Sequence, residues 1–311
     1  MSRISFNELL EAGSHFGHLA RKWNPKMAPY IFGKKNGIHI IDLHKTVIML
    51  DQAADVMKEM ARGGRKILFV ATKKQAKETV AELAASVNMP YVTERWAGGM
   101  LTNFPTIRKA IKKMSTIDKM KEDGTYDKLA KRERLQVDRL RAKLEKNLGS
   151  IRDMTRLPSA LFVVDVMKEA NAVKEAERLN IPIFAMVDTC CDPTPIDYVI
   201  PANDDATKSV ELITGTLCKA IQEGLGERKL EKEKEADSET GESAPAEKLQ
   251  GKKLRSRRTR KSEDAAELRE EKQPEQLKEA AFEAEGKKAE PTAEKVEAEA
   301  EKPAEEVKEE A

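Results

Sequence analysis

"ILFVATKKQAKETVAELAASV", residues 67–87, indicates the fold class of this chain. Residues 67–71 form a short, fully apolar run of strand-forming residues. Residues 73–87 then repeat apolar side chains at helical spacing, through Ala76, Val80 and Leu83. A strand without a polar face, followed directly by an amphipathic helix, is typical of a parallel sheet covered by helices.

The same alternation continues along the chain. Further buried strands are expected at 91–93, 160–165, 181–188 and 197–201, with helices that end near Leu179 and that run from about Asp204 to Gln222. Because crossovers between parallel strands are right-handed, such a series places helices on both faces of the sheet. We therefore predict a doubly wound α/β fold.

The first 62 residues predict two more elements. Asn36-Gly37 lies between two strand-like runs in "PYIFGKKNGIHIID" (29–42), which is a strong signal for a β-hairpin. Apolar residues at helical spacing from Lys45 to Met60 predict an amphipathic helix, and Gly63-Gly64 ends it.

A long insertion interrupts the strand and helix series. About 65 residues separate the second expected strand from the third, whereas a crossover requires about a dozen. Residues 105–121 and a second segment ending before Gly149 carry narrow apolar stripes, and "KEDGTYD" (121–127) offers a turn. We predict an inserted α-helical coiled-coil hairpin at about 104–150. Residues 104–147 hold 14 Lys+Arg against 7 Asp+Glu, so its net charge is +7.

Charge also divides the chain into two parts. Residues 227–311 hold 26 acids and 20 bases (net −6), and residues 1–226 hold 28 acids and 36 bases (net +8), which together give the overall +2. The second part has too few large apolar residues to offset the entropy of ordering. We predict one folded domain at 1–226 and a disordered charged tail at 227–311. The basic run "GKKLRSRRTRK" (251–261) would contact phosphates or only keep the tail soluble.

Cysteine content and hydropathy indicate the compartment in which the protein is found. Three cysteines, Cys190, Cys191 and Cys218, offer neither a disulfide framework nor a paired CxxC metal motif. No apolar run approaches the roughly 18 residues that span a bilayer, and the N-terminus lacks the apolar core of a signal peptide. We expect a soluble cytoplasmic protein.

An enzymatic function has weak support. The turn after the first strand, "ATKKQAKE", contains neither GxGxxG nor GxxxxGK[ST], so it lacks the glycines that let backbone amides enclose a phosphate. Lys73 and Lys74 remain as possible phosphate contacts. Carboxylates follow the later strands and would suit a divalent ion or an acid/base pair, although they are also ordinary turn and cap residues: Asp165, Asp188, Asp192, Asp197, Asp204 and Asp205.

The histidines and cysteines do not form a recognisable catalytic set. His15, His18, His39 and His44 all lie in the first 44 residues, and "HFGH" brings two imidazoles close in sequence. Packed, hydrogen-bonded histidines are the simpler interpretation, and whether His15 and His18 or the strand-end aspartates bind a metal stays open. We predict no cofactor, and Cys190-Cys191 has no evident general base nearby.

The stretch "ERWAGGMLTNFPTIRKAIKKM" (94–114) combines the components of an RNA contact. Arg95 offers a guanidinium for phosphate, Trp96 a ring for stacking, and Gly98-Gly99 a backbone that can approach ribose. Alternatively, Trp96 packs at the base of the insertion. The surplus of cations from Arg108 onward favours RNA, because a hairpin that is merely soluble would intermix both signs.

Several motifs in the same order resemble the bacterial small-subunit ribosomal protein S-two (S2) family: "LLEAGSHFGHLARKWNPKMAPYIFGKKNGIHIIDLHKT", "ILFVATKKQA", "RWAGGMLTNFPTIRK", "LPSALFVVD", "IPIFAMVDT" and "DYVIPANDDA". The resemblance covers residues 3 to about 226. It implies a flavodoxin-like sheet with a coiled-coil insertion, binding to ribosomal RNA, contact with neighbouring small-subunit proteins including the multi-OB-domain ribosomal protein S-one, and no catalytic activity. A cysteine in "DTCCDPTP" stands where such proteins are expected to carry a polar residue.

Charge and motif position together nominate eleven RNA-facing residues. They are Arg21, Lys22, Lys26, Lys34, Lys35, Arg95, Asn103, Arg108, Lys109, Lys112 and Lys113. The predicted function is that of a structural ribosomal protein, associated with ribosomes, that binds RNA through phosphates and shape. The alternatives are an α/β enzyme or binding protein for a phosphorylated metabolite at Lys73 and Lys74, and an interaction scaffold without RNA contact.

Overall fold

The computed structural model describes residues 3–241 of the chain. Its centre is a five-stranded parallel sheet of β4 (Ile67–Val70), β5 (Tyr91–Val92), β6 (Ala160–Val164), β7 (Ile183–Val187) and β8 (Tyr198–Pro201). The strand order is β5-β4-β6-β7-β8, so the parallel strands, numbered along the chain, stand in the order 2-1-3-4-5. That is the strand order of a flavodoxin-like sheet, and the predicted α/β class is confirmed.

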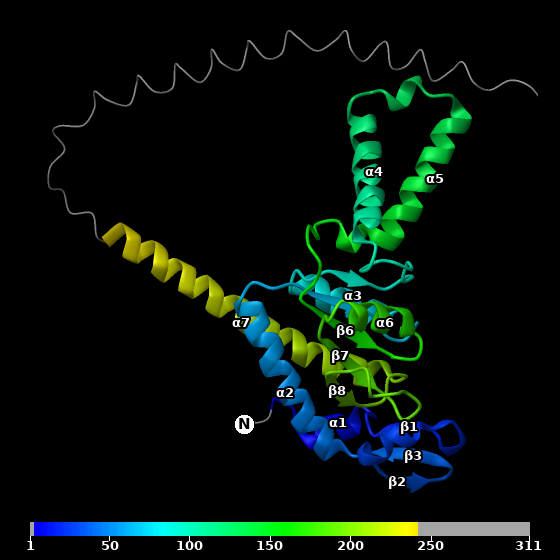
Figure 1. Ribbon diagram of the computed structural model, residues 1–311, viewed down its shortest axis with the longest axis vertical. Coiled ribbons are helices and arrows are strands. Elements are labelled where there is room, and N and C mark those ends of the chain that lie inside the picture. Colours follow the sequence, from blue (N-terminus) through cyan, green and yellow to red (C-terminus); the bar gives the residue numbers. More distant parts are fainter. Residues whose placement is uncertain (1–2, 242–311) are drawn as a thin grey trace, which may run out of the picture. The chain divides into compact units, whose positions relative to one another are not determined.

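Helices cover both faces of this sheet (Figure 1). One face is covered by α2 (Leu43–Arg62), α3 (Lys77–Ser86) and α7 (Thr207–Gly241), and the other by α6 (Ala170–Arg178) and the base of the insertion. Alternate residues of β7 point to opposite faces, since Phe184 joins the first core and Ala185 the second. Because both faces are buried, the three central strands β4, β6 and β7 carry no polar residues.

A second, antiparallel sheet precedes the main one. It consists of β1 (Phe16–Leu19), β2 (Ile31–Lys35) and β3 (Ile38–Ile41), and it follows the short helix α1 (Phe6–Glu11). Two 3-10 segments, Ala20–Lys22 and Pro25–Tyr30, connect β1 to β2. The predicted hairpin is confirmed, because Asn36 and Gly37 have φ angles of 52° and 79° at the turn between β2 and β3.

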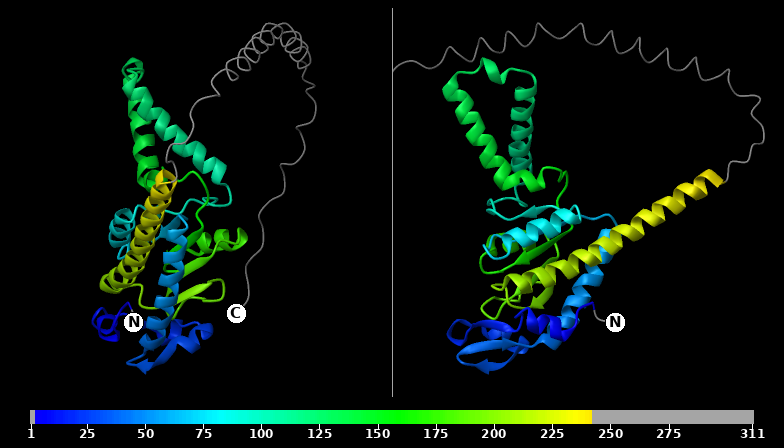
Figure 2. Two further views of the ribbon diagram at one scale, coloured as in Figure 1. Left: turned by 90° about the vertical axis from the view of Figure 1, so that its left-hand side faces the viewer. Right: turned by 180° about the vertical axis from the view of Figure 1, so that it is seen from behind.

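The insertion forms two helices, α4 (Phe104–Glu122) and α5 (Lys131–Leu148), which a 3-10 turn at Tyr126–Lys128 joins. Figure 2 shows the pair from two sides. Ion pairs link the helices, from Lys121 to Asp138 at 2.8 Å and from Arg141 to Asp118. The two predicted helices are therefore present, whereas their supercoiled packing stays a prediction. A further 3-10 turn at Gly149–Ile151 leads back to the sheet.

Helix α3 begins at Lys77, four residues later than the apolar spacing predicted. Residues 73–76 instead form a turn, in which the amides of Ala76 and Lys77 donate to the carbonyl of Lys73 at 3.1 and 2.9 Å. This turn begins three residues after the end of β4 and places the Lys73 side chain at the carboxyl end of the sheet.

Helix α7 continues to Gly241, beyond Gly226, where we expected the folded domain to end. It runs beside α2 in both views of Figure 2. Lys58 of α2 pairs with Glu227 at 2.7 Å, and the Arg62 Nε donates to Glu231 at 2.8 Å. Residues 227–241 are thus helical and not part of an irregular tail. The rest of the predicted tail, 242–311, lies outside the described residues.

Candidate nucleic-acid interface

All eleven residues nominated from the sequence have exposed side chains. They fall into two groups that the fold keeps apart (Figure 1). The N-terminal basic patch, Arg21, Lys22, Lys26, Lys34 and Lys35, lies on the 3-10 segments and on β2. The arm basic patch, Arg95, Asn103, Arg108, Lys109, Lys112 and Lys113, lies before and along α4, at the β5 end of the sheet.

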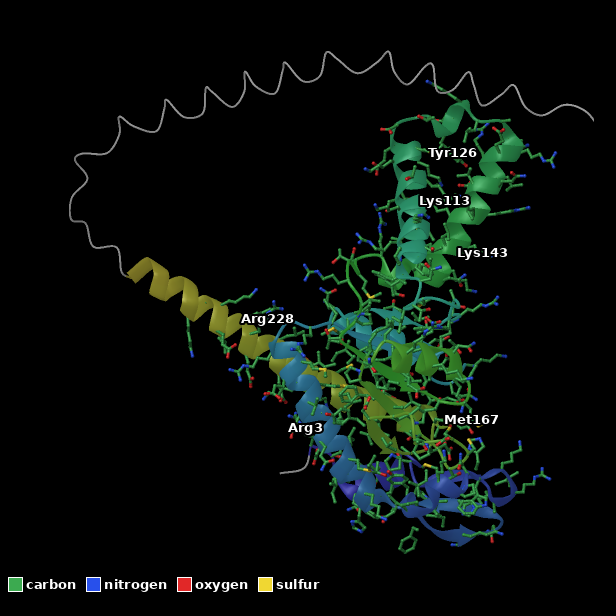
Figure 3. The ribbon with its side chains drawn as sticks, viewed as in Figure 1. Arg3, Lys113, Tyr126, Lys143, Met167 and Arg228 are labelled. Atoms are coloured by element: carbon green, nitrogen blue, oxygen red, sulfur yellow. The ribbon has the colours of Figure 1, made fainter. Side chains whose placement is uncertain are left out.

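The arm basic patch follows one side of α4. Arg108 and Lys112 are four residues apart, as are Lys109 and Lys113, so like charges occupy successive turns. The opposite side carries Ile111, which is buried in the core at the base of the insertion. Figure 3 shows Lys113 on this helix. Among the side chains that the structure describes, those of residues 3–234, no carboxylate lies within 4 Å of these four cations.

Three other cations of the insertion, Lys121, Arg141 and Lys146, are paired within the arm or with the body. Arg141 contacts Asp118 and also Glu145, the latter at 2.6 Å. Lys146 lies 3.4 Å from Glu94. The same helical pair therefore contains cations that hold it together and cations that face away from any acidic residue of the described chain. Only the second kind is free to meet an external anion.

In the N-terminal basic patch, Lys26 alone has an acidic partner among the described residues, and its Nζ lies 2.8 Å from Asp192. That contact holds the pKa of Asp192 down, to about 2. The patch is held near the main sheet by main-chain contacts, because the amide of Asn24 donates to the carbonyl of Thr189 at 2.8 Å. Met27 is fully buried and shares its core with α6.

Glu175 of α6 fixes the loop that enters α4. Its carboxylate accepts hydrogen bonds from the Trp96 Nε1 at 3.1 Å and from the amides of Gly99, Leu101 and Thr102 at 2.8, 2.9 and 3.2 Å. Burial alone would raise the pKa of Glu175, but these donors outweigh it and hold the pKa below its ordinary value. One half-buried carboxylate thus sets the path of the backbone between Arg95 and Asn103.

Trp96 is 9% exposed and belongs to the core below the insertion. Of the two interpretations of this residue, the structure shows the packed one, since the ring is not available to stack on a base. Gly98 and Gly99 belong to the loop that Glu175 holds, and Gly99 has a φ of 81°, which favours glycine.

A cluster of charged side chains fills the crevice at the carboxyl ends of the strands. Lys73 Nζ lies 2.9 Å from Asp204 and 3.5 Å from Asp165, and it also pairs with Asp205. Burial would lower the pKa of Lys73, but hydrogen bonds with Asp205 and Asp204 outweigh it and raise the pKa. Glu169 accepts hydrogen bonds from the amide and hydroxyl of Thr72.

His18 of β1 closes the same cluster from the N-terminal sheet. Its Nδ1 lies 2.8 Å from Asp188 Oδ2, and its Nε2 lies 3.6 Å from Asp205. The hydrogen bond with Asp188 raises the pKa of His18 to about 9. Burial raises the pKa of Asp204 to about 6, against the effect of Lys73. Asp192 and Asp197 do not join the cluster, since Asp197 instead accepts from the amide of Ile183.

The amino-acid sequence of the chain can be compared with those of known proteins. Residues 9–224 match the family described as Ribosomal protein S2. This chain belongs to the ribosomal protein S2 family. The small ribosomal subunit protein uS2 of Porphyromonas gingivalis is 74% identical over 232 residues, which are 75% of this chain and 83% of that protein.

Two other uS2 proteins cover more of the chain. The protein of Parabacteroides distasonis is 67% identical over 267 residues, 86% of this chain and 95% of its own length. The protein of Bacteroides fragilis is 66% identical over 265 residues, 85% of this chain and 94% of its own. The predicted family is confirmed, and with it the predicted class: an S2 protein is a structural, non-enzymatic component of the small ribosomal subunit.

The cluster in this S2 chain also has the wrong charge for a phosphate site. In flavodoxin-like sheets a ligand would lie between β4 and β6, where the strand order reverses. Here Lys73 is engaged by aspartates, and Glu169 places a carboxylate against the Thr72 amide that a phosphate would need. Lys74 is exposed, and no acidic partner is found for it in residues 3–234, whose side chains the structure describes.

The remaining histidines and the cysteines show packing roles. His15 lies against Phe16, with ring centroids 3.9 Å apart, and His44 stacks on Phe6 at 4.8 Å. Of the "HFGH" pair, only His18 meets carboxylates. Cys191 and Cys218 are buried and all three cysteines are free thiols. Burial raises the pKa of Cys218 to about 12, so this thiol stays protonated.

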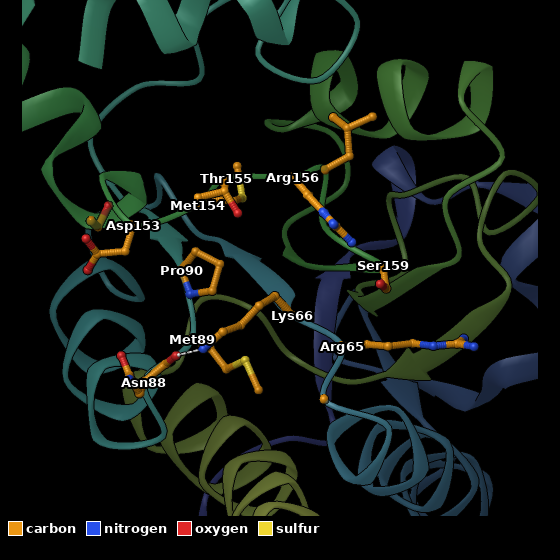
Figure 4. Close-up of a pocket in the computed structure, with 13 residues that line it drawn as sticks. Arg65, Lys66, Asn88, Met89, Pro90, Asp153, Met154, Thr155, Arg156 and Ser159 are labelled. Atoms are coloured by element: carbon orange, nitrogen blue, oxygen red, sulfur yellow. Dashed lines mark hydrogen bonds between the residues drawn. The ribbon is translucent and has the colours of Figure 1, made fainter. Parts of the chain in front are cut away.

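Sequence analysis missed Glu175 and the cationic groove shown in Figure 4. The groove has a volume of about 380 Å³ and lies at the amino ends of the parallel strands, whereas the charged cluster lies at their carboxyl ends. It is lined by Arg65, Lys66 and Arg156 together with Ser150 and Thr155, among others. Its cations come from loops far apart in the sequence, so no local pattern could reveal them. No helix within residues 3–241 has the length and hydropathy of a membrane span.

Proposed function

We propose that the chain binds small-subunit ribosomal RNA through its two basic patches, by neutralising phosphates and by shape. The observation that supports this most directly is the side of α4 that carries Arg108, Lys109, Lys112 and Lys113. Like charges four residues apart destabilise a free helix, by about 0.2–0.5 kcal/mol per pair. Their arrangement has no benefit to the isolated protein, whereas a phosphate backbone along the helix would turn each repulsion into attraction.

The arm presents this patch at a distance from the sheet. We propose that α4 and α5 pack as the coiled-coil hairpin that the sequence predicts. Support comes from buried Ile111, Met114 and Ile117 on one side of α4 and from the ion pairs that join the two helices. A stiff pair would hold the cations in one register, which suits recognition of RNA shape.

The N-terminal basic patch would form a second contact. Arg21 and Lys22 lie on a 3-10 turn with exposed side chains, and Lys34 and Lys35 follow on β2. Both patches border the core that packs on the α6 face, because Met27 and Phe104 belong to that same core. Two contacts separated by the width of the sheet would orient the protein on a folded RNA.

Protein neighbours belong to the same proposal. We expect contacts with other small-subunit proteins, including the ribosomal protein S-one that the family resemblance implies. Exposed apolar side chains on the antiparallel sheet support a protein contact there, since Phe32 is 79% exposed and Phe16 51%. Loss of S-one retention on ribosomes with Phe32→Ser would support the proposed protein contact. We also propose that the protein is located in the cytoplasm, as the sequence predicts.

Salt titration of binding to purified small-subunit RNA tests the proposal. Lys112→Glu with Lys113→Glu should weaken binding and lower the slope of log affinity against log salt by about one to two. Lys208→Glu with Lys219→Glu is the matched control, because these lysines are exposed on α7 at the other face. Equal effects of both double variants, or a flat salt response of the unmodified chain, would contradict the proposal.

The scaffold alternative predicts a different result. If the protein contacted only other proteins, the unmodified chain and both double variants would bind isolated RNA equally weakly, and all three would still sediment with small subunits. The phosphorylated-metabolite alternative is tested separately, by equilibrium dialysis of sugar phosphates against the chain and its Lys73→Ala variant.

A further inference from the structure

Three side chains from separate elements converge at the carboxyl end of the main sheet. His18 comes from β1, Asp188 directly follows β7, and Asp204 follows β8. Each offers a potential ligand atom, and these atoms lie within 4.8 Å of one another. This set does not depend on the RNA contacts proposed above, and the family comparisons do not assign a role to it.

The surroundings of these residues are too negative for the cations present. Four carboxylates, those of Asp165, Asp188, Asp204 and Asp205, surround the single ammonium of Lys73 and the imidazole of His18. Even with the imidazole protonated, the cluster has two negative charges in excess. Asp188 and Asp204 are each 1% exposed, and buried charge is costly unless it is paired or ligates a metal.

One oxygen of the cluster has no partner. Asp204 Oδ1 accepts from Lys73 at 2.9 Å, but Asp204 Oδ2 is buried and receives no hydrogen bond from any residue that the structure describes. Leaving such an acceptor unsatisfied costs about 1–3 kcal/mol, and more when it carries charge. A cation bound at this oxygen would remove that cost and part of the charge excess together.

We propose that His18, Asp188 and Asp204 bind one divalent transition-metal ion of the Zn²⁺ and Mn²⁺ class. One imidazole nitrogen with carboxylate oxygens is a ligand set that suits these ions, whereas Mg²⁺ prefers oxygen alone. The ion would take the place of the hydrogen between His18 Nδ1 and Asp188 Oδ2, which are 2.8 Å apart, and that proton would leave to solvent. The His18 side chain is 29% exposed, which provides an entry path.

The ion would join the two sheets of the protein. β1 already approaches the segment after β7 closely, since a Cβ on Gly17 would lie 2.6 Å from Thr189 Cγ2, and the amide of His18 donates to Thr189 Oγ1 at 2.9 Å. A metal ligated from both sides of this contact would fasten the antiparallel sheet to the main sheet. It would thereby fix the start of the N-terminal basic patch, which begins three residues after His18.

Calorimetric titration of the full, chelator-treated chain tests this proposal. We expect one Zn²⁺ to bind per chain in a saturable manner, Mn²⁺ to bind more weakly, and Mg²⁺ more weakly again. Asp204→Asn and His18→Gln should each weaken Zn²⁺ binding by at least about tenfold. Asp192→Asn is the matched control, because this aspartate lies on the same loop as Asp188 but outside the cluster, and it should leave Zn²⁺ affinity unchanged.

Hydrogen exchange supplies a second readout. Zn²⁺ should increase the protection of amides in residues 14–24 in the unmodified chain and not in His18→Gln. This comparison tests the metal site even if Asp204→Asn fails to fold. The proposal is overturned if the chain shows no saturable Zn²⁺ binding, if His18→Gln binds as tightly as the unmodified chain, or if Mg²⁺ binds as tightly as Zn²⁺.

Discussion

The indole N–H of Trp96 donates to the carboxylate of Glu175 at 3.1 Å, and the same carboxylate accepts three backbone amides of the loop that follows. Trp96 therefore acts on the arm basic patch from within the core, because it helps to hold the loop between Arg95 and Asn103 in one conformation. The positions of Arg95 and Asn103 therefore depend on a carboxylate of another helix, α6.

Replacing this carboxylate should be destabilising. Glu175→Gln places a donor group against several donors, and we expect the free energy of unfolding in urea to fall by about 2–4 kcal/mol. Glu177→Gln is the control, since Glu177 is exposed on the same helix, and it should change stability by less than about 0.5 kcal/mol. Similar losses for the two variants would show that the loop does not rely on Glu175.

The contribution of Glu175 should also depend on pH. Its pKa is lower in the folded chain than its ordinary value. The stability that it contributes is therefore fully present above the unfolded pKa and is lost as pH falls through the folded pKa. The difference in unfolding free energy between the unmodified chain and Glu175→Gln should shrink when urea titrations at pH 7 are repeated under increasingly acidic conditions. A constant difference would contradict this assignment.

Gly17 should not tolerate a side chain. In Gly17→Ala the new Cβ would lie 2.6 Å from Thr189 Cγ2 and 3.1 Å from the carbonyl of His39, so we expect a loss of about 1–3 kcal/mol by thermal or urea unfolding. Gly33→Ala has open space around it and should be nearly neutral. Adding Thr189→Ser to Gly17→Ala removes the methyl contact and should restore part of the loss. No difference between the two glycine variants would rule out the close approach.

Asp192 should restrain RNA binding by the N-terminal basic patch. Its carboxylate pairs with Lys26 at 2.8 Å on an exposed surface. Asp192→Asn frees this lysine, and since exposed pairs contribute about 0.2–1 kcal/mol, affinity for small-subunit RNA should rise by up to about fivefold at low salt. Lys26→Ala should cancel the gain in the double variant. Unchanged or weaker binding of Asp192→Asn would indicate that Lys26 does not face RNA.

The extension of α7 should add little to folding. Beyond Gly226, the described contacts with α2 are exposed ion pairs such as those of Lys58 with Glu227 and Arg62 with Glu231. A chain ending at residue 226 should therefore unfold at nearly the same urea concentration as the full chain, because exposed ion pairs contribute little to stability. Failure of the shorter chain to fold cooperatively would show that the domain requires the longer helix.

Local patterns predicted the elements whose signals are local. The apolar runs that became β4, β6 and β7 are buried on both faces, so their composition alone identified them. Asn36-Gly37 specified its turn because the backbone there requires positive φ angles. The exposure of Arg108 and its neighbours followed from the spacing of the apolar residues on the opposite side of the helix.

Long-range contacts escaped the sequence analysis. Glu175 looks like any charged residue on an amphipathic helix, and its partners lie 73 to 79 positions earlier. The aspartates after the strands were expected at one edge of the sheet. Which of them contact Lys73 and His18 depends on the order in which the strands pair, and this order is not a local property of the sequence. The length of α7 depended likewise on α2, more than 160 residues away in the sequence.

The repulsion along α4 has a consequence for assembly. A helix that carries uncompensated cations on successive turns is less stable alone than beside an anionic partner, so part of the energy of association goes into ordering the arm itself. Its amides should exchange with solvent faster in the free protein than in the ribonucleoprotein particle, while those of the sheet remain equally protected in both. Ordering of α4 and incorporation of the chain into the ribonucleoprotein particle would then occur together.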